Sequence, residues 1–334
     1  PDRWVNPQSP GAHEWWYFDA ISDDGEDALV LVWYAALPFD PAYGLASLRH
    51  IRQPDRHPKP NPLDHCAIGF SWYHKGKPAA YALNAFDADQ FSHGLTEGSL
   101  DLNVHRNQLC RCPDGRYRLQ VQTPVLGFGK KHAQVDLEFI PNQRMTAWER
   151  ELGREGHSHL WILAAADCIV QGEVRVGKKL LKFQGRGYHD HNAGDDELSR
   201  SFEKWYWGRF HHDQSTSVYY VCESMSGQSE GLWLECDSGQ VKSVDSMKSL
   251  ACQDPKRTVF GISYHEQMSS PDGLANWSLG KPVDQGPFYL RWVSRHSQIC
   301  PKSGHGLGFS ELLQASNLNR PLFNWMIPYR LKRP

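Results

Sequence analysis

The stretch EWWYFDAISDDGEDALVLVWYAAL, residues 14–37, holds two runs rich in aromatic and aliphatic residues on either side of a turn signal. That signal is SDDG, residues 22–25, and short polar residues that end in glycine are typical of a tight connection between strands. We therefore predict a β-hairpin here. The second run, residues 28–37, is too short to span a membrane and is expected to be a buried strand.

Strand-like alternation continues along the chain, and helical periodicity is scarce. Short apolar runs separated by turns, such as RYRLQVQT, TSVYYVCE and FYLRWVSRH, indicate an all-β sandwich or barrel. Residues 309–318 are the exception and are expected to form a short C-terminal helix. Residues 52–62, RQPDRHPKPNP, contain four prolines and are expected to be an irregular loop.

A polar stretch, NAGDDELSRSFEK at residues 192–204, separates two strand-rich halves of the 334-residue chain. We place a domain boundary there, giving an N-terminal β domain over residues 1–195 and a C-terminal β domain over residues 196–334. No repeat of fixed period appears, which disfavours a propeller or a solenoid.

The bulk composition excludes several classes of protein. The net charge of −2 argues against a surface for nucleic acids or anionic membranes, which would show a basic excess. No apolar run is long enough for a transmembrane helix. We expect a cytoplasmic protein or one at the membrane periphery, and the start at Pro1 leaves a removed N-terminal signal open. The oligomeric state is left open.

Cysteine and aromatic content point to a packed domain with a ligand space. The 8 cysteines show no CxxC pair of a structural zinc site and are expected to be mostly free, buried thiols. The 13 tryptophans suggest an aromatic-lined cavity, because indole combines a large apolar area with a polar handle.

Two stretches put polar and aromatic side chains together on one strand face. Side chains alternate between the faces of a strand, so His13, Trp15 and Tyr17 of HEWWYFD share a face. In HSHLWIL, His159 and Trp161 do the same, at the polar end of an apolar strand. The alternative for both is an ordinary strand with tryptophans in the core and solvated polar groups.

A third stretch, GRGYHDHNAG at residues 185–194, is the densest in polar groups. Alternation places Tyr188 and Asp190 on one face, and His189 and His191 on the other. Gly185 and Gly187 would allow a bulge or the close approach of another backbone.

A metal site is the alternative use of these histidines. Convergence of His157, His159, His189 and His191 would supply four imidazole ligands. However, neither HxxxH nor HExxH is present, so we expect no metal. We also expect no nucleotide cofactor, because no glycine-rich phosphate loop precedes a helix.

Together, HEWWYFDAISDDG, HLW, GYHDHN and WYWGRF resemble the carotenoid 1,2-hydratase (hydroxyneurosporene synthase) family. The family belongs to a group of two-domain, lipocalin-like isoprenoid hydratases, to which the fungal lipocalin-like Diels–Alderases are more distantly related. The resemblance implies two lipocalin-like β domains that act on an apolar isoprenoid or polyene. It assigns catalysis to a His-x-Trp pair and a Tyr-x-Asp pair, which are here His159, Trp161, Tyr188 and Asp190. The residues expected to bind the substrate are His13, Trp15, Tyr17, Trp205 and Trp207.

The resemblance predicts cofactor-independent, acid-catalysed hydration of a trisubstituted alkene to a tertiary alcohol. Asp190 would deliver the proton, since a carboxylic acid buried among aromatic rings keeps its proton more readily than one in water. Trp161 and Tyr188 would face the cation, and His159 would hold the water or accept its proton.

One departure from the family keeps alternatives open. Ala193 stands where the family often has tryptophan, and a smaller side chain there would reshape the pocket. The alternatives are a cation-driven or Diels–Alderase-like cyclase on the same scaffold, and a non-catalytic carrier of an apolar ligand.

Overall fold

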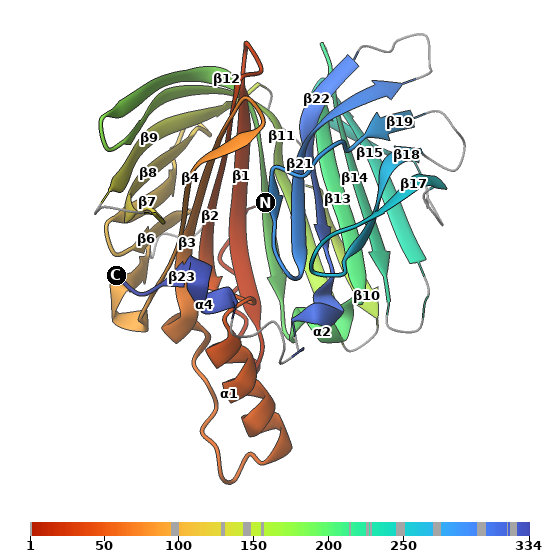
Figure 1. The fold of residues 1–334 in the computed structure, drawn as a ribbon. Helices are drawn as coiled ribbons and strands as arrows, with labels where there is room; N and C mark the ends of the chain where they lie inside the picture. The colour runs from red at the N-terminus through yellow and green to blue at the C-terminus, as the bar shows by residue number, and fades with distance from the viewer. Residues whose placement is uncertain are drawn as a thin grey trace. The chain divides into compact units, whose positions relative to one another are not determined.

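The structure, a computed structural model, describes residues 2–94, 100–127, 131–142, 148–154, 157–213, 215–224, 227, 229–244, 251–269, 275–298, 305–318, 320 and 326–334. The chain divides into two compact units. The first is Pro1–Leu198 with Asn324–Pro334, and the second is Ser199–Phe323. Each is built on one large, mainly antiparallel sheet that is curled (Figure 1), so the prediction of an all-β protein is confirmed.

The first sheet has the strand order β23, β4, β3, β2, β1, β12, β11, β9, β8, β7, β6 and β5, and β10 also pairs with β11. The strands are β1 (His13–Ser22), β2 (Asp27–Ala36), β3 (Cys66–His74), β4 (Lys77–Phe86), β5 (Phe91–His93), β6 (Asp101–Val104), β7 (Asn107–Arg111), β8 (Tyr117–Pro124), β9 (His132–Pro141), β10 (Trp148–Arg154), β11 (His157–Val176), β12 (Lys179–Gly194) and β23 (Leu331–Lys332). The predicted hairpin is confirmed, because β1 and β2 pair antiparallel across the SDDG turn.

The core of the first unit lies on one face of this sheet. Trp16 and Phe18 of β1 share a buried cluster with Leu31 of β2 and with Leu109 and Val135 of the distant strands β7 and β9. Side chains from strands far apart in the strand order meet in this cluster, so the sheet folds over on itself. Period-two alternation produces this one-sided core, and it leaves the other face of β1 for other uses.

The second sheet has the strand order β16, β15, β14, β13, β22, β21, β19, β18 and β17, and β20 pairs with β21. The strands are β13 (Lys204–His211), β14 (Thr216–Glu223), β15 (Ser229–Asp237), β16 (Gln240–Val244), β17 (Ala251–Arg257), β18 (Ser263–Ser269), β19 (Ala275–Ser278), β20 (Asp284–Gln285), β21 (Tyr289–Gln298) and β22 (His305–Leu313). Its core is aromatic, with Tyr219, Trp233, Trp277 and Trp292 in one buried cluster.

Helix α1 (Pro41–Arg52) breaks the β pattern, and the scarcity of helical periodicity did not predict it. Its start follows from local chemistry. The Asp40 side chain accepts a hydrogen bond from the backbone N–H of Ala42 at 2.9 Å, and Pro41 occupies the first turn, where its missing N–H costs nothing. Residues 53–61 form no helix or strand, as the prolines predict, and the 3₁₀ helix η1 (Pro62–His65) follows.

The helix predicted over residues 309–318 is wrong. The first half of that segment, residues 309–313, belongs to strand β22, which is followed by the 3₁₀ helix η3 (Ala315–Asn317). β22 pairs with β13 on one side and β21 on the other, and pairing on both edges outweighs the helical propensity of Glu311, Leu312 and Leu313. The short helix near the C-terminus is instead α4 (Ile327–Arg330).

The last residues of the chain lie with the first unit, where β23 pairs in parallel with β4. The remaining short elements are α2 (Leu198–Ser201) and the 3₁₀ helix η2 (Ala88–Gln90). Within the described residues, no helix has both the length and the apolar character that crossing a bilayer requires. Among the described residues, the cysteines outside any disulfide are Cys66, Cys110, Cys112, Cys168, Cys222, Cys236 and Cys252, and Cys300 lies outside the described residues.

Candidate active site

Three adjacent strands of the first sheet bring the predicted catalytic residues together. β12 lies between β1 and β11, and its Asn192 stands opposite Trp15 on one side and Trp161 on the other. Directly paired residues point to the same face of a sheet. Asp190, which stands opposite Tyr17, therefore shares a face with Trp161 across the two strands.

The Asp190 carboxyl group is the centre of this face. It is 4% exposed, and three side chains donate hydrogen bonds to it. Trp161 Nε1 and Tyr188 Oη each lie 2.9 Å from Oδ2, and Asn192 Nδ2 lies 2.8 Å from Oδ1. The two rings are fully buried, so a carboxyl group is held in place inside an aromatic surround.

A chain of hydrogen bonds runs from Asp190 to the start of β1 and the residues just after β12. Asn192 Oδ1 lies 3.0 Å from Nε2 of His159, and Nδ1 of His159 lies 3.1 Å from Nε2 of His13. Nδ1 of His13 lies 2.9 Å from the backbone oxygen of Asp196. The chain therefore joins one carboxyl group to one backbone carbonyl through an amide and two imidazoles.

Both imidazoles of the chain favour their neutral form. Burial lowers the pKa of His13 to about 4, against backbone hydrogen bonds that act in the opposite direction. Burial, together with the nearby His13, lowers the pKa of His159 to about 3. Both residues are 0% exposed, and an imidazolium there would lose its hydration by bulk solvent.

Aromatic rings surround this chain. Trp15 lies 5.3 Å from the ring of His13 and 5.4 Å from that of His159, centroid to centroid. Tyr17 meets Tyr188 edge to face at 6.4 Å. His13, Trp15 and Tyr17, predicted to bind substrate, therefore lie on the same face as the predicted catalytic residues.

His189 and His191 lie on the opposite face, as alternation predicts. His189 Nε2 is 2.8 Å from Oδ2 of Asp2, and His191 Nε2 is 2.8 Å from Oε1 of Glu14. These histidines are engaged by carboxylates inside the core of the first unit, away from His159. Among the described residues, no group of three or more His, Cys, Asp and Glu side chains is arranged to hold a metal ion. The side chain of His157, the fourth histidine of the alternative metal site, is not among those described.

Two glycines of the third motif explain how β12 packs closely. A Cβ on Gly185 would collide with the backbone oxygen of Ile21, and one on Gly187 would meet the side chains of Phe139 and Val170 within 2.6 Å. The predicted close approach at these positions is confirmed. β11 also shifts register twice opposite this stretch, on either side of Ala165.

Ala193 does not lie where its substitution would reshape this site. It stands opposite Glu14 on β1 and Leu160 on β11, on the face that carries His189 and His191. The expectation that a smaller side chain here reshapes the pocket is therefore wrong for the surroundings of Asp190, because a side chain one residue from Asn192 points to the other side of the strand.

Trp205 and Trp207 belong to the second unit. They lie on β13, and alternation places them on one face with Arg209 and His211, opposite the face of Tyr206 and Phe210 that forms the core. Both tryptophans are buried, at 7% and 4% exposure.

Sequence reasoning missed Asn192 and the part that His13 plays in the hydrogen-bond chain. Asn192 follows Asp190 by two residues, so the alternation that paired Tyr188 with Asp190 also places Asn192 on their face. The link through His13 had no such signal, because it depends on which strand lies next to β12.

Known proteins resemble this chain over nearly its full length. A protein of Chlorobaculum tepidum named hydroxyneurosporene dehydrogenase is 25% identical over 350 residues, which cover 99% of this chain and 90% of the relative. An acyclic carotenoid 1,2-hydratase of Thiocapsa roseopersicina is 27% identical over 337 residues, covering 97% of this chain and 74% of the relative.

Solved structures share the fold at low sequence identity. An AttH-like protein of Nitrosomonas europaea superposes with a TM-score of 0.61 at 13% identity, over 91% of this chain and 92% of the other. Kievitone hydratase of Nectria haematococca superposes with a TM-score of 0.55 at 10% identity, over 93% and 92%. A family model described as carotenoid hydratase CrtC matches residues 57–334, and the chain belongs to this family.

Proposed function

We propose that this protein adds water to a carbon–carbon double bond of an acyclic carotenoid or a similar apolar polyene, by acid catalysis and without a cofactor. The family and the name of the Thiocapsa roseopersicina relative support the substrate class. The observation that carries the proposal is the buried Asp190 carboxyl group, held by Trp161, Tyr188 and Asn192.

The reaction needs a proton donor, a stabilised cation and a water molecule. The O–H bond of protonated Asp190 breaks, and a C–H bond forms at the less substituted alkene carbon. The tertiary cation that results is stabilised by the faces of Trp161 and Tyr188, an interaction of about 0.5–2 kcal/mol or more when desolvated. Water then forms the C–O bond, and its surplus proton restores Asp190. The sum is alkene plus water to alcohol, so no electron acceptor is consumed.

Counting protons along the hydrogen-bond chain supports a protonated Asp190. The backbone oxygen of Asp196 can only accept, so Nδ1 of His13 donates to it. In a neutral His13 the other nitrogen then accepts, so Nδ1 of His159 carries the proton of that ring. Nε2 of a neutral His159 must therefore accept from Asn192.

We propose that the amide of Asn192 takes the orientation that meets this requirement. With its NH₂ group toward His159, half a turn from the orientation described above, the amide oxygen faces Oδ1 of Asp190. Two acceptor oxygens meet there unless Asp190 carries a proton. Because the lowered pKa values of His13 and His159 favour neutral rings, every hydrogen bond of this chain has a donor and an acceptor when Asp190 is a carboxylic acid.

The test compares two buried carboxyl groups. Asp190→Asn keeps the shape and removes the transferable proton, so turnover of an acyclic carotenoid should fall by about 10²–10⁴-fold. Asp27→Asn is the matched control. Asp27 is 7% exposed and accepts the indole N–H of Trp72 at 2.7 Å on the first sheet, and this variant should keep its turnover.

Two further readouts separate the alternatives. At neutral pH, the infrared carbonyl band of a protonated carboxylic acid should be present in the wild type and in Asp27→Asn, and absent in Asp190→Asn. With ¹⁸O-labelled water, the product should contain the label. A cyclic product without the label would refute hydration. Full turnover by Asp190→Asn would refute acid catalysis by Asp190. Binding of the carotenoid without any turnover would favour a non-catalytic carrier.

A further inference from the structure

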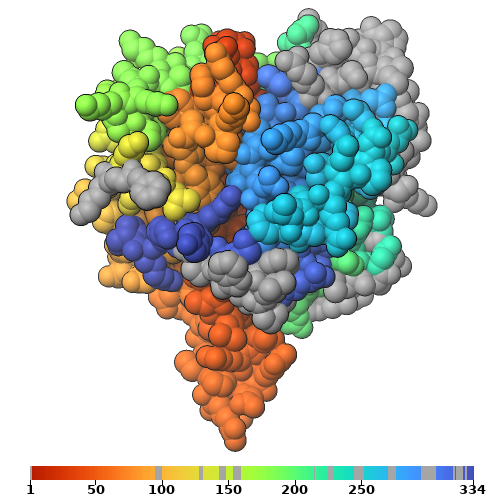
Figure 2. Space-filling view, viewed as in Figure 1, coloured from red at the N-terminus to blue at the C-terminus, as the bar shows by residue number. Residues whose placement is uncertain are grey.

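Helix α1 and the loop after it carry a feature that the reaction does not use. We call residues 41–61 the basic hairpin. Figure 1 shows it projecting beyond the end of the first sheet, and Figure 2 shows it as an orange wedge below the other atoms of the first unit. Its sequence, PAYGLASLRHIRQPDRHPKPN, holds four Lys or Arg residues and one Asp, a net charge of +3 in a chain of net charge −2.

The outer side of α1 is apolar and exposed. Leu45, Leu48 and Ile51 are 48%, 36% and 40% exposed, and their three-residue spacing puts them along one side of the helix. The inner side is anchored, because Tyr43 is 2% exposed and its hydroxyl donates to the backbone oxygen of Ala12 at 2.7 Å. Three large aliphatic side chains in a row on a projecting helix are a candidate contact surface.

Positive charge flanks this apolar side. Arg49 and Arg52 lie in the last turn of α1, and Arg56 and Lys59 follow in the loop. All four are exposed, and in the described part of the chain no carboxylate forms an ion pair with them. The near-neutral total charge, which argued against an anionic membrane surface, therefore conceals a local excess.

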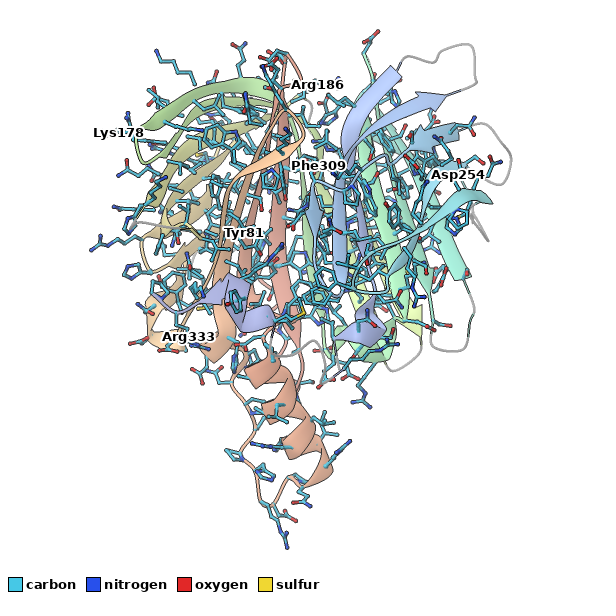
Figure 3. The ribbon with its side chains drawn as sticks, viewed as in Figure 1. Tyr81, Lys178, Arg186, Asp254, Phe309 and Arg333 are labelled. Atoms are coloured by element: carbon cyan, nitrogen blue, oxygen red, sulfur yellow. The ribbon has the colours of Figure 1, made fainter. Side chains whose placement is uncertain are left out.

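The hairpin is held in its shape before any contact is made. At its tip, Nδ1 of His50 lies 2.8 Å from the backbone oxygen of His57, which ties the loop to the helix. At its base, Asp40 is 2.8 Å from Nδ1 of His65 and also pairs with Arg333, which Figure 3 places beside the start of α1. A fixed projection loses little conformational entropy on docking.

We propose that the basic hairpin docks the protein on an anionic lipid bilayer. Leu45, Leu48 and Ile51 would enter the boundary between headgroups and acyl chains, and the four basic side chains would meet the negative headgroups. The inference goes beyond the hydration proposed above and does not depend on it. An apolar polyene dissolves in bilayers, so such docking would bring the enzyme to its substrate.

A second copy of the chain fits this surface less well. A symmetric dimer would place two hairpins of charge +3 against each other, and like charges repel. Three half-exposed side chains also bury far less than the roughly 800 Å² per partner of a stable interface.

The test is sedimentation of the whole protein with two kinds of vesicle, phosphatidylcholine alone and phosphatidylcholine mixed with phosphatidylglycerol. The mixed vesicles should bind the protein, and added salt should weaken that binding. Arg49→Gln with Arg52→Gln should reduce partitioning roughly 25-fold, about fivefold for each charge. Leu45→Ser with Leu48→Ser should reduce it roughly tenfold or more.

Matched controls come from β11, β12 and the turn between them, where Figure 3 labels Lys178 and Arg186 away from α1. Leu180 and Ile169 are 44% and 46% exposed, and their serine variants should bind as the wild type does. Lys178→Gln with Lys179→Gln should also change little. All variants should hydrate substrate dispersed in detergent at the wild-type rate.

Three results would overturn the proposal: equal binding to both vesicles, equal losses in the control variants, or a dimer in sedimentation equilibrium that the Leu45 and Leu48 substitutions dissociate. Failure of the proposed reaction would look different, since vesicle binding would persist without turnover.

Discussion

Replacing Asp2 by asparagine is expected to lower the free energy of unfolding of the first unit by about 3–5 kcal/mol. Asp2 accepts the indole N–H of Trp16 at 3.0 Å, and its carboxylate lies 2.8 Å from His189 and 3.4 Å from His191. These side chains are at most 1% exposed, so water screens none of the attraction. Removing the carboxylate leaves the buried imidazoles and the Trp16 indole without the group that they face.

The pH dependence of this loss follows from the pKa of Asp2. Burial alone would raise that pKa, but the charge and hydrogen bond of His189 and the charge of His191 outweigh it, so the pKa lies below 3.8. A carboxyl group with a depressed folded pKa stabilises the protein above its unfolded pKa, and the contribution disappears as the pH falls through the folded value. The difference between wild type and Asp2→Asn should therefore shrink as the pH falls below about 3.8.

The assay is amide hydrogen exchange of β1 and β12 under native conditions, combined with urea denaturation. Asp136→Asn is the control, because Asp136 pairs with Arg118 at 3.1 Å while both side chains are about half exposed. That surface pair should contribute about 0–1 kcal/mol. A loss for Asp2→Asn no larger than that of the control, or one that does not shrink in acid, would refute the reasoning.

Three shorter predictions concern the same unit. Gly185→Ala should destabilise it by about 1–3 kcal/mol in urea denaturation, because the new Cβ meets the backbone of β1. Gly44→Ala is the control and should stabilise the unit by about 0.5–1 kcal/mol, because a Cβ at Gly44 meets no atom within 4 Å. Equal effects of the two substitutions would contradict this. With pKa values of about 4 and about 3, His13 and His159 should show no change in ¹⁵N chemical shift between roughly pH 5 and 8. The stability of the protein should fall as the pH drops below about 6.5, because these two imidazoles take up protons there in the unfolded chain but not in the folded one. Trp161→Phe keeps an aromatic ring but loses the 2.9 Å hydrogen bond to the Asp190 carboxyl group, so kcat should fall about tenfold or more while the fold is unchanged. An unaltered kcat would show that the Trp161 indole has no part in catalysis.

The two-residue alternation of side chains along strands predicted most of the residue positions in the candidate site. Two-residue spacing alone separates Tyr188 and Asp190 from His189 and His191, and it does the same for His159 with Trp161. The composition did not indicate the basic hairpin, because the net charge of the whole chain, −2, hides a local net charge of +3 over residues 41–61. Helical propensity gave a wrong prediction over residues 309–318, because strand β22 in this segment pairs with β13 on one side and β21 on the other.

The sequence by itself determined the all-β class, the β1–β2 hairpin and the face on which each motif residue lies. Each of these depends on residues a few positions apart, whose geometry the backbone sets locally. Only the tertiary structure decided that β12 lies between β1 and β11, which joins Asp190 through Asn192 and His159 to His13, 177 positions earlier in the chain. It also decided that Ala193 faces away from that site, and that His189 and His191 meet Asp2 and Glu14 in the core. Such contacts depend on strand order, which is set by how a whole sheet buries its apolar face rather than by any local spacing.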